Sequence, residues 1–102
     1  MKIANTGQCL SISEIPELTA VNSADFREEV HSSLQPEFPA VIEIDLSDTR
    51  FVDSSGLGAL FALYRTIGED GAVVLRLLNP KPEIQQLLEL TQMQELFEIV
   101  QR

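Results

Sequence analysis

The chain has 102 residues, the size of one small domain. Its 16 acidic and 7 basic residues leave a formal net charge of −9, which would repel nucleic-acid phosphates and an anionic bilayer. The single Cys9 excludes an internal disulfide, and the chain shows no zinc-ligand spacing, signal-peptide core or membrane-length apolar run. We therefore expect a cytoplasmic protein with basic protein partners, no cofactor, no membrane insertion and no direct contact with nucleic acid.

The first elements in chain order are a predicted β-hairpin and a helix. Residues 1–4 and 8–14 are the expected strands, because Asn5-Thr6-Gly7 suits a tight turn. Asn22 or Ser23 is placed to cap the helix, whose apolar residues recur at helical spacing, namely Phe26, Val30 and Leu34. This helix is expected to cover one face of a sheet.

The middle of the chain predicts a βαβ unit. Residues 40–46 are rich in β-branched side chains and follow Pro36 and Pro39, which is typical of a strand. Residues from about 55 to 68 are expected to form a helix that ends near Gly68. Residues 72–78 form the second apolar strand, and a helical crossover between two such strands is typical of parallel pairing.

The C-terminal part predicts a helix at residues 82–88 after Pro80, and Thr91 and Gln94 have the spacing of a capping box for a short fourth helix. Residues 97–100 alternate like an edge strand. Residues 1–102 are therefore expected to form one α/β domain, with a mixed sheet of four or five strands and about four helices packed on it.

The sequence contains no complete catalytic or metal-binding set. A hydrolase elbow needs glycine two residues before its serine, but Asp53 precedes Ser55 there, and the only histidine, His31, lies within the first predicted helix. No phosphate-binding glycine loop is complete. Asp45 and Asp48 are interpreted, like Asp53, as capping or solvated carboxylates. We expect no enzyme activity.

Residues 51–58, Phe-Val-Asp-Ser-Ser-Gly-Leu-Gly, place two hydroxyls where a strand leads into a helix. Such a junction has free backbone N–H groups and a partial positive charge. Ser54 and Ser55 therefore have two open interpretations. A serine there commonly caps the helix, and the same position favours a phosphate on its hydroxyl as a regulatory modification.

These residues resemble the signature of the STAS domain, the fold of bacterial anti-sigma factor antagonists. The resemblance rests on residues 41–46 and 51–58, and it extends over nearly the whole chain, with residues 17–18 and 22–26 similar to the family's first loop and helix. It implies that Ser55 is phosphorylated by an anti-sigma factor that is itself an ATP-dependent kinase. It also implies that the unphosphorylated protein binds that kinase and thereby releases a sigma factor, and that a serine phosphatase restores this form. The partner-binding residues would be Asp53, Ser54, Gly56, Leu57 and Asn22.

The loop before the first predicted helix departs from the family pattern. It reads Pro16-Glu17-Leu18-Thr19 where the family often has Gly-Glu-Leu-Asp. Because loops absorb such changes, the departure affects the prediction of the fold less than the prediction of the partner, whose identity is left open. Related STAS domains act instead as non-phosphorylated accessory or scaffold subunits, for instance on a lipid-transporting ABC complex. An enzyme or ligand-binding module is a third alternative. A true serine at Ser55 favours the antagonist. Self-association is left open, with a monomer as the expectation.

Overall fold

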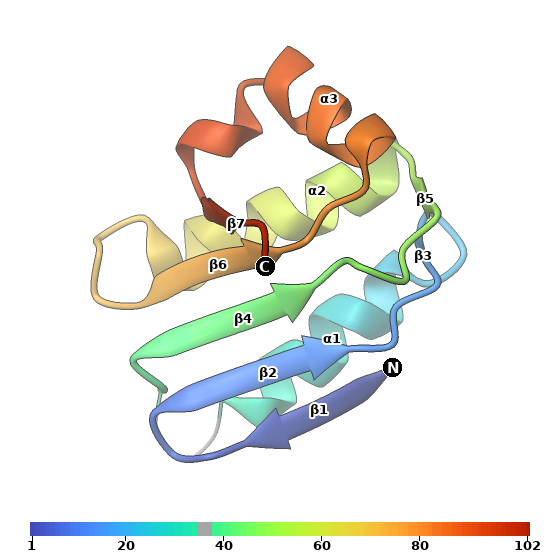
Figure 1. The fold of residues 1–102 in the computed structure, drawn as a ribbon. Helices are drawn as coiled ribbons and strands as arrows, with labels where there is room; N and C mark the ends of the chain where they lie inside the picture. Colours follow the sequence, from blue (N-terminus) through green and yellow to red (C-terminus); the bar gives the residue numbers. More distant parts are fainter. Residues whose placement is uncertain (35–37) are drawn as a thin grey trace.

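The computed structural model describes residues 1–34 and 38–102, so Pro36 lies outside the described residues. Its main sheet has five strands in the order β1-β2-β4-β6-β7 (Figure 1). β1 is antiparallel to β2 and the other neighbours are parallel, which confirms the predicted mixed sheet. The strands are β1 (Lys2–Asn5), β2 (Cys9–Ser13), β4 (Val41–Asp45), β6 (Val74–Leu78) and β7 (Glu98–Val100).

The predicted N-terminal hairpin is confirmed. The Asn5 side chain accepts a hydrogen bond from the backbone N–H of Gly7 at 2.8 Å, and Gly7 has a φ of +88°. An asparagine that bonds to the backbone two residues on, followed by a residue free to adopt positive φ, closes the tight turn between β1 and β2. β7 lies at the opposite edge of the sheet, where the sequence predicted an edge strand.

Helices α1 (Ser23–Ser33) and α2 (Ser54–Leu63) cover the same face of the sheet (Figure 1). α2 continues into the π-helical turn η1 (Tyr64–Gly68), so the predicted helix ends at the expected glycine but widens in its last turn. Alternate residues of the strands point toward these helices and are buried against the apolar faces of the helices. The buried strand residues include Leu10, Ile12, Ile42, Ile44, Leu75 and Leu77, and the buried helix residues include Phe26, Val30 and Leu60.

The C-terminal helices differ in detail from the prediction. α3 (Pro82–Leu90) forms as expected, but the fourth helix is only the 3-10 turn η2 (Met93–Glu95). The capping box at Thr91 was wrong, because its hydroxyl donates to the carbonyls of Leu87 and Leu88 at the end of α3. Gln92 then adopts a φ of +59°, and this left-handed residue turns the chain into η2.

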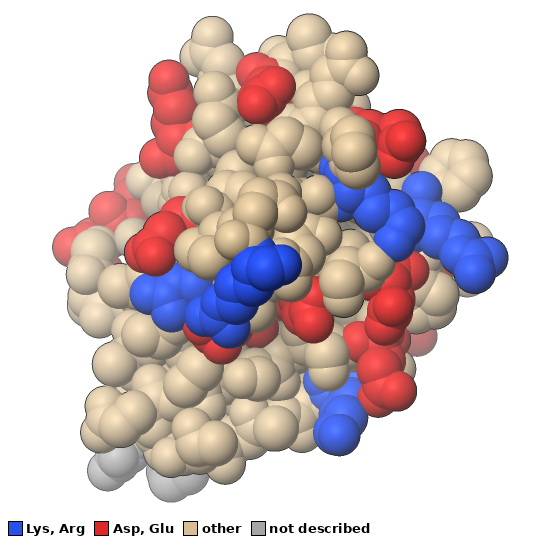
Figure 2. Space-filling view, viewed as in Figure 1, with Lys and Arg blue, Asp and Glu red and all other residues tan. Residues whose placement is uncertain are grey.

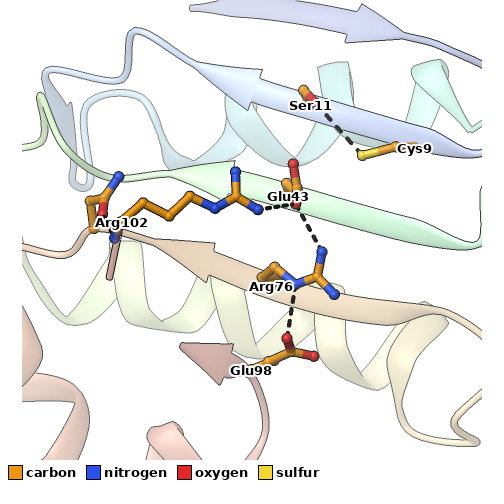
Figure 3. A network of polar contacts seen from close by, with 7 residues as sticks. Cys9, Ser11, Glu43, Arg76, Glu98 and Arg102 are labelled. Carbon is orange, nitrogen blue, oxygen red and sulfur yellow. Dashed lines mark hydrogen bonds and ion pairs between the residues drawn. The ribbon is translucent and has the colours of Figure 1, made fainter. Parts of the chain in front are cut away.

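An ionic network lies across the face of the sheet that α1 and α2 leave open. The Arg76 guanidinium contacts a Glu43 carboxylate oxygen at 2.9 Å and a Glu98 oxygen at 3.0 Å, and Arg102 contacts Glu43 at 3.3 Å (Figure 3). Basic and acidic side chains are intermixed over this side of the molecule (Figure 2). Parallel strands are usually covered on both faces, and here charged side chains make the uncovered face compatible with water.

Arg76→Met is expected to lower the free energy of unfolding by about 1 kcal/mol at neutral pH, because Arg76 and Glu43 are only 24% and 15% exposed. The hydrogen bond from Arg76 holds the pKa of Glu43 below its ordinary value. A depressed carboxyl pKa stabilises the fold above the unfolded pKa, and this contribution is lost as the pH falls through the folded pKa.

The difference between wild type and Arg76→Met, measured by denaturant unfolding, should therefore shrink below about pH 4.3. Arg65→Met is the matched control, because the Arg65–Glu69 pair is well exposed and its loss should cost less than about 0.5 kcal/mol. A difference that persists unchanged at low pH would show that Arg76 acts through packing alone.

Candidate functional site

A second, two-stranded sheet positions the start of α2. β3 (Glu17–Leu18) runs parallel to β5 (Phe51–Val52), and neither strand was predicted. The ladder continues into the helix start, because the Asp53 N–H donates to the Leu18 carbonyl at 3.3 Å. Leu18 is fully buried and anchors this small sheet in the core. The loop before α1 and the chain before α2 are thereby held side by side.

Asp53 is the N-cap of α2, and each of its two carboxylate oxygens accepts a hydrogen bond from a backbone N–H. Oδ1 accepts the backbone N–H of Gly56 at 2.9 Å, which satisfies one free donor of the first turn. Oδ2 accepts the N–H of Ala20 at 3.1 Å, so the same side chain ties the loop before α1 to the helix start. The bond from Gly56, and then that from Ala20, lowers the pKa of Asp53. Asp53 is therefore a structural carboxylate that stays ionised.

Ser54 and Ser55 are the first two residues of α2, and both are exposed. With Asp53 in the capping position, the capping alternative for these serines was wrong. Among the described residues, neither serine hydroxyl makes a hydrogen bond to the protein. Two serines whose hydroxyls make no hydrogen bond to the described residues are thus exposed to solvent at the positive end of a helix.

Asn22 precedes α1 at the predicted cap position, but its side chain bonds away from the helix. Oδ1 accepts the Thr19 N–H at 2.8 Å, and Nδ2 donates to the Glu17 carbonyl at 2.6 Å. The Thr19 hydroxyl in turn accepts the N–H of Val21 at 3.2 Å. These bonds fix the loop of residues 19–22, which lies beside the start of α2 because Ala20 bonds to Asp53.

Gly56 is buried, in contrast to the two serines before it. A Cβ atom added to Gly56 would lie 1.9 Å from the carbonyl oxygen of Leu18, so only glycine allows α2 to approach β3 this closely. Leu57 is half-buried and packs against the core. Gly56 thus sets the position of the helix, and Leu57 leaves part of its side chain at the surface.

Two exposed apolar side chains on the segments joined to Asp53 were not identified from the sequence. Val21 is 84% exposed on the loop that bonds to Asp53, and Phe51 is 66% exposed on β5, two residues before Asp53. A valine in a turn and an aromatic residue at the exposed position of a short strand are the signals that were available. Val21, Phe51, Ser54, Ser55 and Leu57 are together called the α2-start surface.

Asp53→Ala is expected to destabilise the domain at neutral pH, because it removes the cap of α2 and the link to Ala20. The folded pKa of Asp53 is depressed, so its contribution is present above its unfolded pKa and is lost as the pH falls through the folded pKa. Denaturant unfolding of the variant and the wild type should therefore converge in acid, below about pH 3.9. Asp48→Ala, at an exposed position, is the control and should unfold like wild type.

The acidic residues near the strand ends serve local turns. Asp45 Oδ1 accepts the Ser47 N–H at 2.9 Å, much as Asp53 accepts that of Gly56. Within residues 1–34 and 38–102, no three side chains of the metal-ligating types come together as a metal site would require. In the same part of the chain, no helix combines the length and apolar character needed to span a bilayer.

The sequence profile of the STAS domain family matches residues 2–102, and the chain belongs to this family. The fold also matches solved structures. A Thermotoga maritima protein assigned as an anti-sigma factor antagonist superposes with a TM-score of 0.86 at 21% identity, over 99% of this chain and 85% of that one. An anti-sigma-factor antagonist domain protein from Planctomyces limnophilus gives 0.83 at 21% identity, over 98% and 87%.

The Bacillus protein SpoIIAA in its phosphorylated form shares the fold as well. Its TM-score is 0.76 at 20% identity, and the match covers 99% of this chain and 89% of SpoIIAA. Several structural relatives, SpoIIAA among them, are described as anti-sigma factor antagonists, and SpoIIAA is known in a phosphorylated and an unphosphorylated form.

Proposed function

We propose that this chain is an anti-sigma factor antagonist whose binding is controlled by phosphorylation of Ser55. In its unphosphorylated form it binds a kinase-type anti-sigma factor through the α2-start surface and so releases a sigma factor. The observation that carries the proposal is the exposed hydroxyl of Ser55, which has no partner among the described residues because Asp53 caps the helix. Membership of the STAS family and the antagonist relatives support it.

The position of Ser55 suits a reversible charge switch. A phosphate adds about −1.5 to −2 charges, and the first turn of α2 favours an anion, so the modified domain stays folded. The Asp53 carboxylate is already ionised at the same helix end, so the added phosphate creates a dense local negative charge. A partner that binds the neutral serine closely then meets a group that is costly to desolvate.

In this proposal the chain is a substrate and a binding partner, not a catalyst. Phe51 and Val21 supply apolar contact area, Ser54 and Leu57 border Ser55, and Gly56 and Asn22 hold the surface in shape rather than contact the partner. A serine phosphatase reverses the modification. The protein acts in the cytoplasm as a monomer, without direct contact to nucleic acid.

Phosphorylation is tested by incubating the purified chain with a kinase-type anti-sigma factor from the same organism and ATP. Intact-mass analysis should show one added phosphate, and fragmentation should place it on Ser55. Ser55→Ala should remain unmodified, whereas the matched variant Ser54→Ala should still accept one phosphate on Ser55. A phosphate on Ser54, or no transfer together with tight binding to a transporter ATPase, would contradict the proposal.

A further inference from the structure

β1 leaves one edge of the five-stranded sheet open (Figure 1). Its register with β2 continues to Thr6, whose N–H donates to the Cys9 carbonyl at 3.0 Å. Bonded and non-bonded pairs alternate along an antiparallel ladder. Ala4 therefore directs its backbone groups toward β2, whereas Ile3 and Asn5 direct theirs outward. These outward groups are available to a further strand.

The outer flank of α1 lies beside this edge and is acidic. A shallow groove of about 440 Å³ separates the helix from the strand, and it is lined by Ile3, Asp25, Glu28, Glu29, Ser32 and Ser33. The three carboxylates are exposed, and none forms an ion pair within the described residues. The basic Arg27 and the single His31 line a different pocket, between α1 and α2, which Glu28 also borders. The groove beside β1 is therefore negatively charged.

A second copy of this chain is a poor occupant of the edge. Antiparallel pairing of two β1 strands about a twofold axis would place both α1 helices on the same face of the joined sheet. The acidic flanks would then face each other, and like charges brought together in this way oppose association. The formal charge of −9 on each copy adds to the repulsion.

We propose that the β1 edge binds an extended basic segment of a partner protein by strand addition. The backbone of the segment pairs with the outward groups of Ile3 and Asn5. Every second side chain of the segment points toward α1, where lysine or arginine lies against the carboxylates of Asp25, Glu28 and Glu29. This surface is separate from the α2-start surface and does not depend on phosphorylation of Ser55.

The test uses a synthetic peptide of alternating lysine and threonine, titrated into the chain of residues 1–102. Binding should slow amide hydrogen exchange at Ile3 and Asn5 and should weaken steeply with salt. The double variant that carries both Glu28→Lys and Glu29→Lys should bind the peptide at least about tenfold more weakly than wild type. Glu83→Lys with Glu95→Lys, on α3 and η2, carries the same charge change far from β1 and should bind like wild type.

The role of the strand edge is tested separately from charge. Asn5→Pro and Asn5→Ala both lose the side-chain bond to Gly7, but only Asn5→Pro also loses the outward N–H. Asn5→Pro should therefore bind the peptide at least about fivefold more weakly than Asn5→Ala. The circular dichroism spectrum of each variant checks that the fold is retained. If Asn5→Pro binds as tightly as Asn5→Ala, if the peptide does not bind, or if the protein dimerises through β1 instead, the proposal is wrong.

Discussion

Gly56→Ala is expected to lower the free energy of unfolding by about 3 kcal/mol, because the new methyl group would overlap the backbone carbonyl of Leu18. Backbone cannot rotate aside as a side chain can, so α2 must move away from β3. For a domain of this size such a loss lowers the melting temperature by more than about 10 °C. Thermal unfolding followed by circular dichroism measures the shift.

Gly58→Ala provides the matched comparison within the same helix. A Cβ atom at Gly58 would meet nothing within 4 Å, and the residue lies inside α2, where alanine is favoured over glycine by about 0.5 to 1 kcal/mol. This variant should therefore be as stable as wild type or more so. Equal destabilisation of the two variants would mean that the close contact between α2 and Leu18 does not exist in solution.

Ser55→Asp is expected to reduce affinity for the kinase-type anti-sigma factor by at least about 100-fold, because a buried, unpaired charge at an interface is strongly penalised. Ser55→Ala should bind as tightly as the unmodified protein, since the wild-type hydroxyl has no partner among the described residues. Titration calorimetry with the purified kinase and a non-hydrolysable nucleotide measures both affinities without allowing phosphorylation.

Ser54→Asp is the control for general charge effects at the helix start. It adds the same charge one residue away, also on an exposed side chain. If affinity depends on the position of the anion, this variant should lose less affinity than Ser55→Asp. Equal binding by wild type, Ser55→Ala and Ser55→Asp would refute control by phosphorylation, although the STAS fold would stand.

The long helices and strands could be predicted because their apolar residues recur with a regular period along the whole element. Leu10 and Ile12 alternate with half-buried residues on β2, and Phe26 and Val30 are spaced by one turn on α1, so periodicity alone identifies a strand and a helix. Their order then predicts the mixed sheet. The capping box at Thr91 failed because spacing does not reveal that Gln92 turns left-handed and ends the regularity there.

The details of the candidate site were harder to predict. Asp53, Ser54 and Ser55 are all good caps, so spacing cannot decide which one takes the position; contacts to Ala20 and Gly56 select Asp53. β3 and β5 contribute only two residues each, too few for a pattern of alternation. The exposure of Phe51 follows from this short sheet and could not be read from the chain.

Main-chain contacts, besides the Asp53 side chain, hold the segment that leads into α2. Asp53 bonds to the carbonyl of Leu18, and the Arg50 N–H bonds to that of Pro16 at 2.9 Å. Such contacts persist when most side chains in the loop change, so in the proposed switch the placement of Ser55 and the recognition of the partner would be governed by different atoms. Under the proposed function, substitution of Val21 or Phe51 would change which partner binds while Ser55 keeps its place at the start of α2.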